Sequence, residues 1–252
     1  EEEQRMKSKT VFVCRECGNE TPRWQGQCPA CGAWNSIVEF EDKKAPARQN
    51  AVRGVARSTP KKLRDVTVGN EIRFSTGMGE LDRVLGGGGV AGSLVLVGGA
   101  PGIGKSTLLL QVMARLVELG HSALYVSGEE SPTQIALRAQ RLQLEPRGLT
   151  LMSEIELEHI ESVISSRKPE YVVIDSIQTI FSSQLDSAPG SVSQVRECAA
   201  RLTRMAKTVG TTLIFVGHVT KDGSLAGPKV LEHCIDCSIM LDGDADNRFR
   251  TL

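Results

Sequence analysis

The chain has 252 residues, of which 40% are hydrophobic and 24% charged, so it is long enough for one large domain and one small one. Thirty basic and thirty acidic side chains give a formal net charge of zero, which excludes a general attraction to polyanions. No apolar run approaches the roughly 20 residues that span a bilayer, and the charged start resembles no secretion signal, so we expect a cytoplasmic protein without a membrane partner.

Four cysteines near the N-terminus form two pairs of equal spacing. Cys14 and Cys17 form one C-x-x-C motif, and Cys28 and Cys31 form a second. In each motif two residues separate the cysteines, and a glycine follows the second cysteine. Such turns aim two thiolates at one point, and cytoplasmic thiols stay reduced, so clustered cysteines favour metal binding. We expect a structural zinc held by all four, with a redox pair or a chance spacing as the alternatives. Residues 1–40 then form a small module whose folding depends on zinc.

A basic stretch separates this module from the rest of the chain. Residues 43–64 contain eight basic side chains and no acidic one: Lys43, Lys44, Arg48, Arg53, Arg57, Lys61, Lys62 and Arg64. Two prolines and little apolar periodicity predict a linker over residues 41–66. A solvated tether is one interpretation, and a basic arm that contacts phosphates is the other. Residues 67–252 are expected to form the large domain.

A phosphate-binding loop is the strongest motif of the large domain. The apolar run Leu94–Val97 predicts a buried strand, and it leads into G-A-P-G-I-G-K-S, a full match to the pattern GxxxxGK(S/T). An amphipathic helix is expected from about residue 105 to 119. Lys105 is expected to contact the β and γ phosphates of ATP, and Ser106 to bind magnesium. The residues expected to hold the nucleotide are Gly99, Ala100, Pro101, Gly102, Ile103, Gly104, Lys105, Ser106 and Thr107.

Carboxylates follow two further expected strands. The apolar strand Tyr171–Asp175 ends in an aspartate that is expected to hold magnesium through water, although a capping role is the alternative. The strand Ala123–Val126 is followed by S-G-E-E, where a carboxylate at the sheet edge is placed to polarise the attacking water. Glu129 is the predicted base and Glu130 the second candidate. The alternative for Glu130 is an ordinary acid in the first turn of the next helix.

The fourth expected strand, Thr211–Val216, leads to Gly217 and His218. His218 is placed to sense the terminal phosphate of ATP, with a structural histidine as the alternative. Strands that alternate with helical patterns predict an α/β fold with a mostly parallel central sheet flanked by helices. Cys234 and Cys237 repeat the zinc-like spacing without a second pair nearby, so we expect buried strand thiols there.

In this order the motifs resemble those of the bacterial RadA (Sms) family of recombination ATPases, which are related to RecA. The segments that carry the resemblance span residues 11–252 and read CRECG, CPACG, STGMGELDRVLGGG, GGAPGIGKSTLLLQ, YVSGEESPTQI, VVIDSIQTI and FVGHVTKDGSLAGPKVLEH. The resemblance implies a RecA-like P-loop ATPase core behind the zinc module. It assigns the roles given above to Lys105, Ser106, Asp175 and Glu129, and it gives His218 the place of the RecA-type sensor.

The resemblance also implies an activity and partners. The expected assembly is a homo-hexameric ring that hydrolyses ATP between subunits and moves on single-stranded DNA during branch migration of recombination intermediates. A RecA-type recombinase is the expected protein partner, and DNA repair is the expected process. A nucleotide-switched module that docks partner proteins without moving on DNA is the alternative function.

Two loops of RecA-like proteins face DNA in the central channel. They correspond here to residues 176–195 and 219–233, in which Gln178, Lys221 and Lys229 are the candidate DNA contacts. Polar loops bracketed by glycine are able to follow a nucleic-acid backbone and donate to phosphates. Flexible surface loops without a DNA contact are the alternative.

Two departures from the family pattern concern the end of the chain. The family carries a K-N-R-F-G motif after the core and a Lon-protease-like domain beyond it, whereas this sequence reads D-N-R-F-R at residues 246–250. The first lysine and the last glycine of the motif are absent, so its role is not transferred. We therefore expect a core truncated before the C-terminal domain, and ring formation and DNA unwinding do not follow from this sequence alone.

Overall fold

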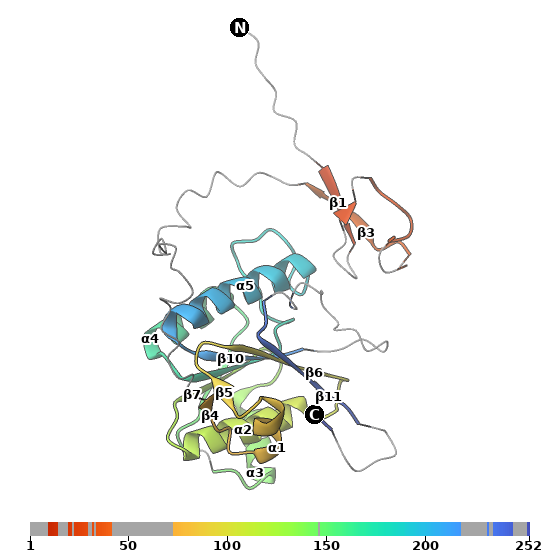
Figure 1. Cartoon of the computed structure of the whole chain (residues 1–252). Coiled ribbons are helices and arrows are strands. Elements are labelled where there is room, and N and C mark those ends of the chain that lie inside the picture. The colour runs from red at the N-terminus through yellow and green to blue at the C-terminus, as the bar shows by residue number, and fades with distance from the viewer. Residues whose placement is uncertain are drawn as a thin grey trace, which may run out of the picture. The chain divides into compact units, whose positions relative to one another are not determined.

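The structure of the chain is a computed structural model (Figure 1). It describes residues 10–14, 20–21, 23–29, 32, 34–41, 73–145, 147–217, 231, 234–243 and 251–252. The chain divides into two compact units, Glu1–Glu71 and Ile72–Leu252. Nearly all of the predicted linker lies outside the described residues.

The first unit contains a small antiparallel sheet. Its strands are β1 (Thr10–Cys14), β2 (Glu20–Thr21) and β3 (Ile37–Glu41), in the order β2-β1-β3. Among its described residues the buried hydrophobic cluster consists of Cys14, Cys28 and Ile37, with Phe12 packed against it. A module of about 30 residues buries little apolar surface, so a unit of this kind depends on a further source of folding free energy.

The second unit is built around a six-stranded parallel sheet, which confirms the predicted fold class. The strands are β6 (Leu94–Gly99), β7 (Ala123–Ser127), β8 (Thr150–Ser153), β9 (Tyr171–Asp175), β10 (Thr212–Val216) and β11 (Cys237–Leu241). Their order across the sheet is β11-β6-β10-β9-β7-β8, and every neighbouring pair is parallel. Strands β6, β7, β9 and β10 are buried along their whole length, as a sheet covered on both faces requires.

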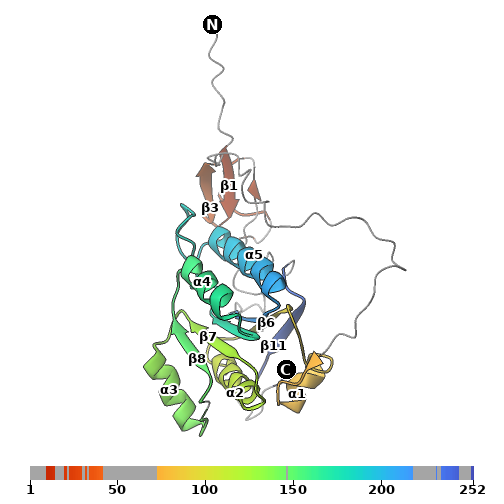
Figure 2. The ribbon, with the colours of Figure 1, turned by 90° about the vertical axis from the view of Figure 1, so that its left-hand side faces the viewer.

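Helices cover both faces of this sheet (Figures 1 and 2). They are α1 (Gly79–Val84), α2 (Lys105–Glu118), α3 (Pro132–Arg141), α4 (Leu157–Arg167) and α5 (Val192–Val209). Alternate side chains of β6 separate the two cores: Leu94 and Leu96 pack with α4 and α5, whereas Val95 and Val97 pack with α1, α2 and α3. A two-stranded hairpin, β4 (Arg73–Phe74) and β5 (Gly89–Val90), flanks α1. Among the described residues, no helix is both long and apolar enough to cross a membrane.

The N-termini of the helices differ in a way that bears on the site. Helix α3 is capped by Ser131, which forms a capping box with Gln134, and α5 is capped by the hydroxyl of Ser191. Helix α2 has Gly104 as its N-cap, and, as in α1 and α4, no side chain caps its first amide groups. Its amides and the positive end of its dipole are therefore available to an anionic ligand.

The prediction of buried strand thiols at Cys234 and Cys237 needs correction. Cys237 begins β11, but Cys234 precedes this strand, and both thiols are half-buried rather than buried. Strand β11 lies at one edge of the sheet, where each residue has a strand on one side only. An edge strand leaves its side chains more exposed than a central one.

Candidate functional site

The candidate site lies at one edge of the parallel sheet. In a parallel sheet all strands end at the same edge, so the segments that follow β6, β7, β9 and β10 converge there. Ser127 at the end of β7 is paired with Asp175 at the end of β9, and Val216 of β10 with Val97 of β6. The sheet thus brings the phosphate-binding loop, Asp175 and the tandem glutamates to a common edge.

The loop between β6 and α2 holds Lys105 tightly. Only 4% of Lys105 is exposed, and its Nζ donates to the carbonyl oxygens of Gly99 and Ala100, each at 2.9 Å. Gly99 tolerates no side chain, because a Cβ there would lie 2.6 Å from the carbonyl oxygen of Leu241 on the neighbouring strand. The ammonium is thus fixed inside the loop beside the uncapped start of α2, where the phosphates of a nucleotide bind.

The positive charge of Lys105 interacts with the negative charges of Asp175 and Glu129. Burial lowers the pKa of Lys105, while the negative charges of Asp175 and Glu129 oppose this shift. These three side chains come from three different segments that meet at the sheet edge. A lysine whose charge interacts with two carboxylates suits a site that binds phosphates together with a divalent metal ion.

Asp175 fits a magnesium site. It is 7% exposed at the end of β9, and the hydroxyl of Tyr125 donates to its Oδ2 at 2.5 Å. Magnesium prefers oxygen ligands and usually keeps several waters, so one carboxylate and the Ser106 hydroxyl at the start of α2 are a suitable donor set. When bound, the metal would neutralise charge on the phosphates, and Asp175 and Ser106 are the residues that would hold it.

The tandem glutamates have different partners. Ser176, which follows Asp175, donates its hydroxyl to Glu129 Oε1 at 2.8 Å. Glu130 instead forms an ion pair with Arg138 of α3, and its amide donates to Ser127 Oγ at 2.9 Å. Helix α3 has no acidic residue in its first turn, so the alternative role for Glu130 as a first-turn acid is wrong. This geometry favours Glu129 as the residue that faces the nucleotide.

Gly128 makes this separation of the glutamates possible. Its amide donates to the carbonyl oxygen of Asp175 at 2.8 Å, which joins the two strand ends. A Cβ at this position would lie 2.0 Å from Thr179 Oγ1, so only glycine fits. The close approach holds the segment after β7 against the segment after β9 and directs Glu129 toward Ser176.

The first candidate DNA loop is bonded to the helices behind it. Gln194 of α5 donates to the carbonyl oxygens of Ser182 at 3.1 Å and of Ser187 at 2.9 Å. The hydroxyl of Ser182 donates to Glu158, which in turn pairs with Arg201. These bonds disfavour the alternative of a loop without fixed conformation, at least for residues 182–187.

Other candidate DNA contacts are less well placed or lie outside the described part of the chain. Gln178 is half-buried, so little of its side chain is offered to a large ligand. His218, Lys221 and Lys229 lie outside the described residues, and their predicted roles stay predictions. The exposed tip of the first loop carries Asp186, a charge that would repel phosphates.

The first unit contains part of the predicted zinc site. Cys14 and Cys28 are buried, and Cys14 Sγ lies 3.2 Å from the hydroxyl oxygen of Ser36. The amide of Gly32 donates to the carbonyl oxygen of Cys28 at 2.8 Å, which closes the turn of the second cysteine pair. Cys17 and Cys31 lie outside the described residues. The two described thiols therefore come together in one cluster, as a shared metal would require.

Loss of zinc is expected to unfold the first unit and leave the second intact. Structural zinc contributes about 10–16 kcal/mol to the folding of small zinc modules, so Cys28→Ser should remove most of its stability. The only two tryptophans of the chain, Trp24 and Trp34, belong to this unit, so their emission reports on it alone. The measurement is tryptophan emission with metal analysis, beside nucleotide binding. Cys234→Ser is the control, and full zinc content in Cys28→Ser would contradict the assignment.

Three residues of the site carried no recognisable signal in the sequence. Tyr125 reads as one apolar position of a buried strand, Ser176 as a loop residue and Arg138 as a helical surface charge. Each acquires a role only through a partner in another element: Asp175, Glu129 and Glu130. The sequence offered one hint for Tyr125: the hydroxyl of a tyrosine in a buried strand usually needs a hydrogen-bond partner.

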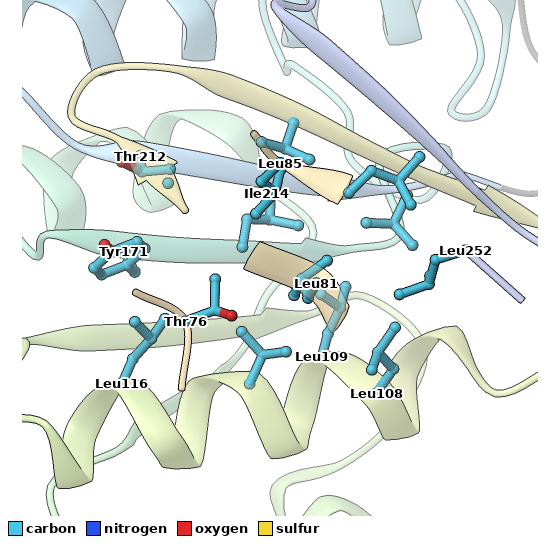
Figure 3. A pocket seen from close by; sticks show the side chains of 15 residues that line it. Thr76, Leu81, Leu85, Leu108, Leu109, Leu116, Tyr171, Thr212, Ile214 and Leu252 are labelled. Atoms are coloured by element: carbon cyan, nitrogen blue, oxygen red, sulfur yellow. The ribbon is translucent and has the colours of Figure 1, made fainter. Parts of the chain in front are cut away.

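A small apolar cavity lies under the sheet (Figure 3). It has a volume of about 20 Å³, room for about one water molecule, between the sheet and helices α1 and α2. Figure 3 shows Leu81, Leu109 and Tyr171 among the side chains around it. The described residues that line it are apolar apart from Thr76, Tyr171, Thr212 and Gly89.

Comparisons with known proteins match a metal binding domain to the first unit and an ATPase-type domain to most of the second. The AAA domain family matches residues 40–224, and a rubredoxin metal binding domain matches residues 12–39. Proteins called DNA repair protein RadA are 56% identical to the chain in Salmonella typhimurium, 55% in Escherichia coli and 51% in Bacillus subtilis. The alignments cover 97%, 97% and 98% of this chain but 54% of each relative, so the chain spans about half the length of these relatives.

A solved structure shares the fold. A KaiC-like protein from Pyrococcus horikoshii superposes with a TM-score of 0.59 over 71% of this chain and 84% of its own length. At 22% identity this likeness concerns the fold alone. The family matches agree with a structural zinc in the first unit and with magnesium and ATP at the phosphate-binding loop of the second.

Proposed function

The chain belongs to the AAA domain family and, within it, to the RadA proteins, and from this we propose that it hydrolyses ATP to remodel DNA in recombination and repair. The observation that carries the proposal is the convergence of Lys105, Asp175 and Glu129 beside the uncapped start of α2. Lys105 binds the phosphates, Asp175 and Ser106 hold magnesium, and Glu129 accepts a proton from the attacking water.

The substrate that we propose beyond ATP is single-stranded DNA, with branched recombination intermediates as the structures that are remodelled. The names of the relatives support a role in DNA repair. The loop anchored by Gln194 lies after β9, so it leaves the same sheet edge as Asp175. A loop connected directly to the metal-binding strand offers a short route from the nucleotide to DNA.

For the whole protein we propose a homo-hexameric ring that acts in the cytoplasm with a RecA-type recombinase. The proposal rests on the resemblance of the motifs and on the relatives' role in repair. In such a ring, ATP would be hydrolysed between neighbouring subunits. Because the chain spans about half the length of its relatives, assembly is best tested beside the Escherichia coli relative.

DNA is expected to stimulate ATP turnover, and ATP is expected to tighten DNA binding. Coupling energies between two sites are typically about 1–3 kcal/mol, so a non-hydrolysable ATP analogue should tighten single-stranded DNA binding roughly 5–150-fold relative to ADP. The measurements are steady-state turnover with and without DNA, and DNA affinity at several salt concentrations. A nucleotide-switched docking module would instead turn over slowly, ignore DNA and bind it equally with either nucleotide.

A further inference from the structure

We propose that Tyr125 is a positioning residue for the metal-binding carboxylate: its hydroxyl holds one oxygen of Asp175 so that the other is presented to magnesium. The inference rests on the proposed function only in taking Asp175 as a magnesium-binding residue. Tyr125 itself touches neither the metal nor the phosphates. Its effect is therefore expected in the metal dependence of nucleotide binding.

The register of the sheet explains how Tyr125 reaches Asp175. Tyr125 of β7 is paired with Val173 of β9, and Asp175 lies two residues further along the same strand. Side chains two residues apart point to the same face of a sheet, so Asp175 lies on the face that Tyr125 occupies. A diagonal neighbour of this kind is within reach of an aromatic side chain but not of a short one. The hydroxyl of Tyr125 accordingly meets Asp175 Oδ2 at 2.5 Å.

The contact is buried on both sides. Tyr125 is 1% exposed and Asp175 is 7% exposed, so water does not compete for this bond. A bond to an ionised carboxylate in such surroundings is short and stronger than a neutral one. It removes the rotational freedom that the carboxylate at the end of a strand would otherwise keep. The carboxylate is thus ordered before metal arrives, which reduces the cost of binding.

A tyrosine hydroxyl, whose ordinary pKa is about 10, is protonated at neutral pH and donates to the carboxylate of Asp175. Burial raises the pKa of Tyr125 far above its usual value, and the neighbouring charge of Asp175 raises it further. Arg138 and Glu130 also lie near Tyr125 and act in opposite directions, Arg138 lowering and Glu130 raising its pKa. The phenol is thus a neutral donor beside the carboxylate. Unlike a lysine, it orders Asp175 without neutralising the charge that magnesium needs.

The chain contains a matched control for the loss of this hydroxyl. Its only other tyrosine is Tyr171, on β9, which is 2% exposed. The Tyr171 hydroxyl is buried and has no hydrogen-bond partner among the described residues, and its ring packs edgewise against Phe74 and His121. Tyr171→Phe and Tyr125→Phe therefore remove the same atom from equally buried rings of one sheet. Only the second change removes a bond to a carboxylate.

The test is a magnesium titration of nucleotide binding on the chain itself, read with a fluorescent ATP analogue. Tyr125→Phe is expected to raise the magnesium concentration at half-saturation about 10-fold, since loss of a group that orients a metal ligand typically costs 10–100-fold. Nucleotide binding in EDTA should be unchanged. Tyr171→Phe should match the parent both in the magnesium concentration at half-saturation and in nucleotide binding in EDTA. Electron paramagnetic resonance of bound Mn²⁺ with the same nucleotide should show the same loss of metal affinity in Tyr125→Phe.

A double-mutant cycle then shows whether Tyr125 acts through Asp175. In an Asp175→Asn background, Tyr125→Phe should cause no further loss of metal affinity, because the two changes remove the same interaction. Parent-like magnesium dependence in Tyr125→Phe, or additive losses in the cycle, would overturn the inference while leaving the proposed function in place. A parent chain whose nucleotide binding ignores magnesium would overturn the proposed function as well.

Discussion

Replacement of Lys105 by alanine is expected to lower ATP turnover by roughly 10³-fold or more and to weaken nucleotide binding. The buried ammonium is fixed in the loop by the carbonyl oxygens of Gly99 and Ala100, beside the start of α2. Loss of one preorganised donor at a site of developing charge typically costs about 10²–10³-fold, and a charged donor is stronger. Without the ammonium, Asp175 and Glu129 would also repel the phosphates. Both effects act in the same direction.

The measurements for Lys105→Ala are steady-state turnover and binding of a fluorescent ATP analogue. Lys207→Ala, which removes an exposed lysine from the last turn of α5, is the matched control and should behave like the parent. Thermal unfolding of both variants shows whether the second unit remains folded. Turnover of Lys105→Ala within a few-fold of the parent would contradict the assignment of the loop.

The second large effect is expected from Glu129→Gln, which should bind nucleotide like the parent but lower the rate of the chemical step by at least about 100-fold. General bases contribute typically 10²–10⁴-fold, and glutamine keeps the shape of the side chain while it loses the ability to accept the proton. The amide is still able to accept the hydrogen bond from Ser176. Single-turnover hydrolysis separates the chemical step from product release.

Glu130→Gln distinguishes the two tandem glutamates. Glu130 is paired with Arg138, so the loss of its charge should lower the free energy of unfolding rather than the rate of the chemical step. Glu118→Gln on α2, which alters an exposed ion pair with Arg115, is the control for a general loss of negative charge. If Glu130→Gln abolished single-turnover hydrolysis and Glu129→Gln did not, the assignment of the base would be wrong.

The features that the sequence predicted are those encoded by neighbouring residues. The phosphate-binding loop is a continuous motif, and the strands Leu94–Gly99, Ala123–Ser127 and Tyr171–Asp175 are runs of residues buried on both faces. Their burial leaves a continuous apolar pattern that needs no knowledge of the partner strands. Strand Thr150–Ser153 was not predicted. It is the last strand of the sheet, opposite β11, and its residues are only partly buried, so it lacks a continuous apolar pattern.

By itself, then, the sequence determined the fold class, the nucleotide loop and the cysteine pairs, because each depends on spacing along a short segment. Only the tertiary structure separated Glu129 from Glu130, since their partners Ser176 and Arg138 lie on other elements. The same holds for Tyr125 and Asp175, which are 50 residues apart and meet because β7 and β9 are neighbours in the sheet. Hydrogen bonds between distant residues depend on strand order and register, and both are set by the packing of the whole domain.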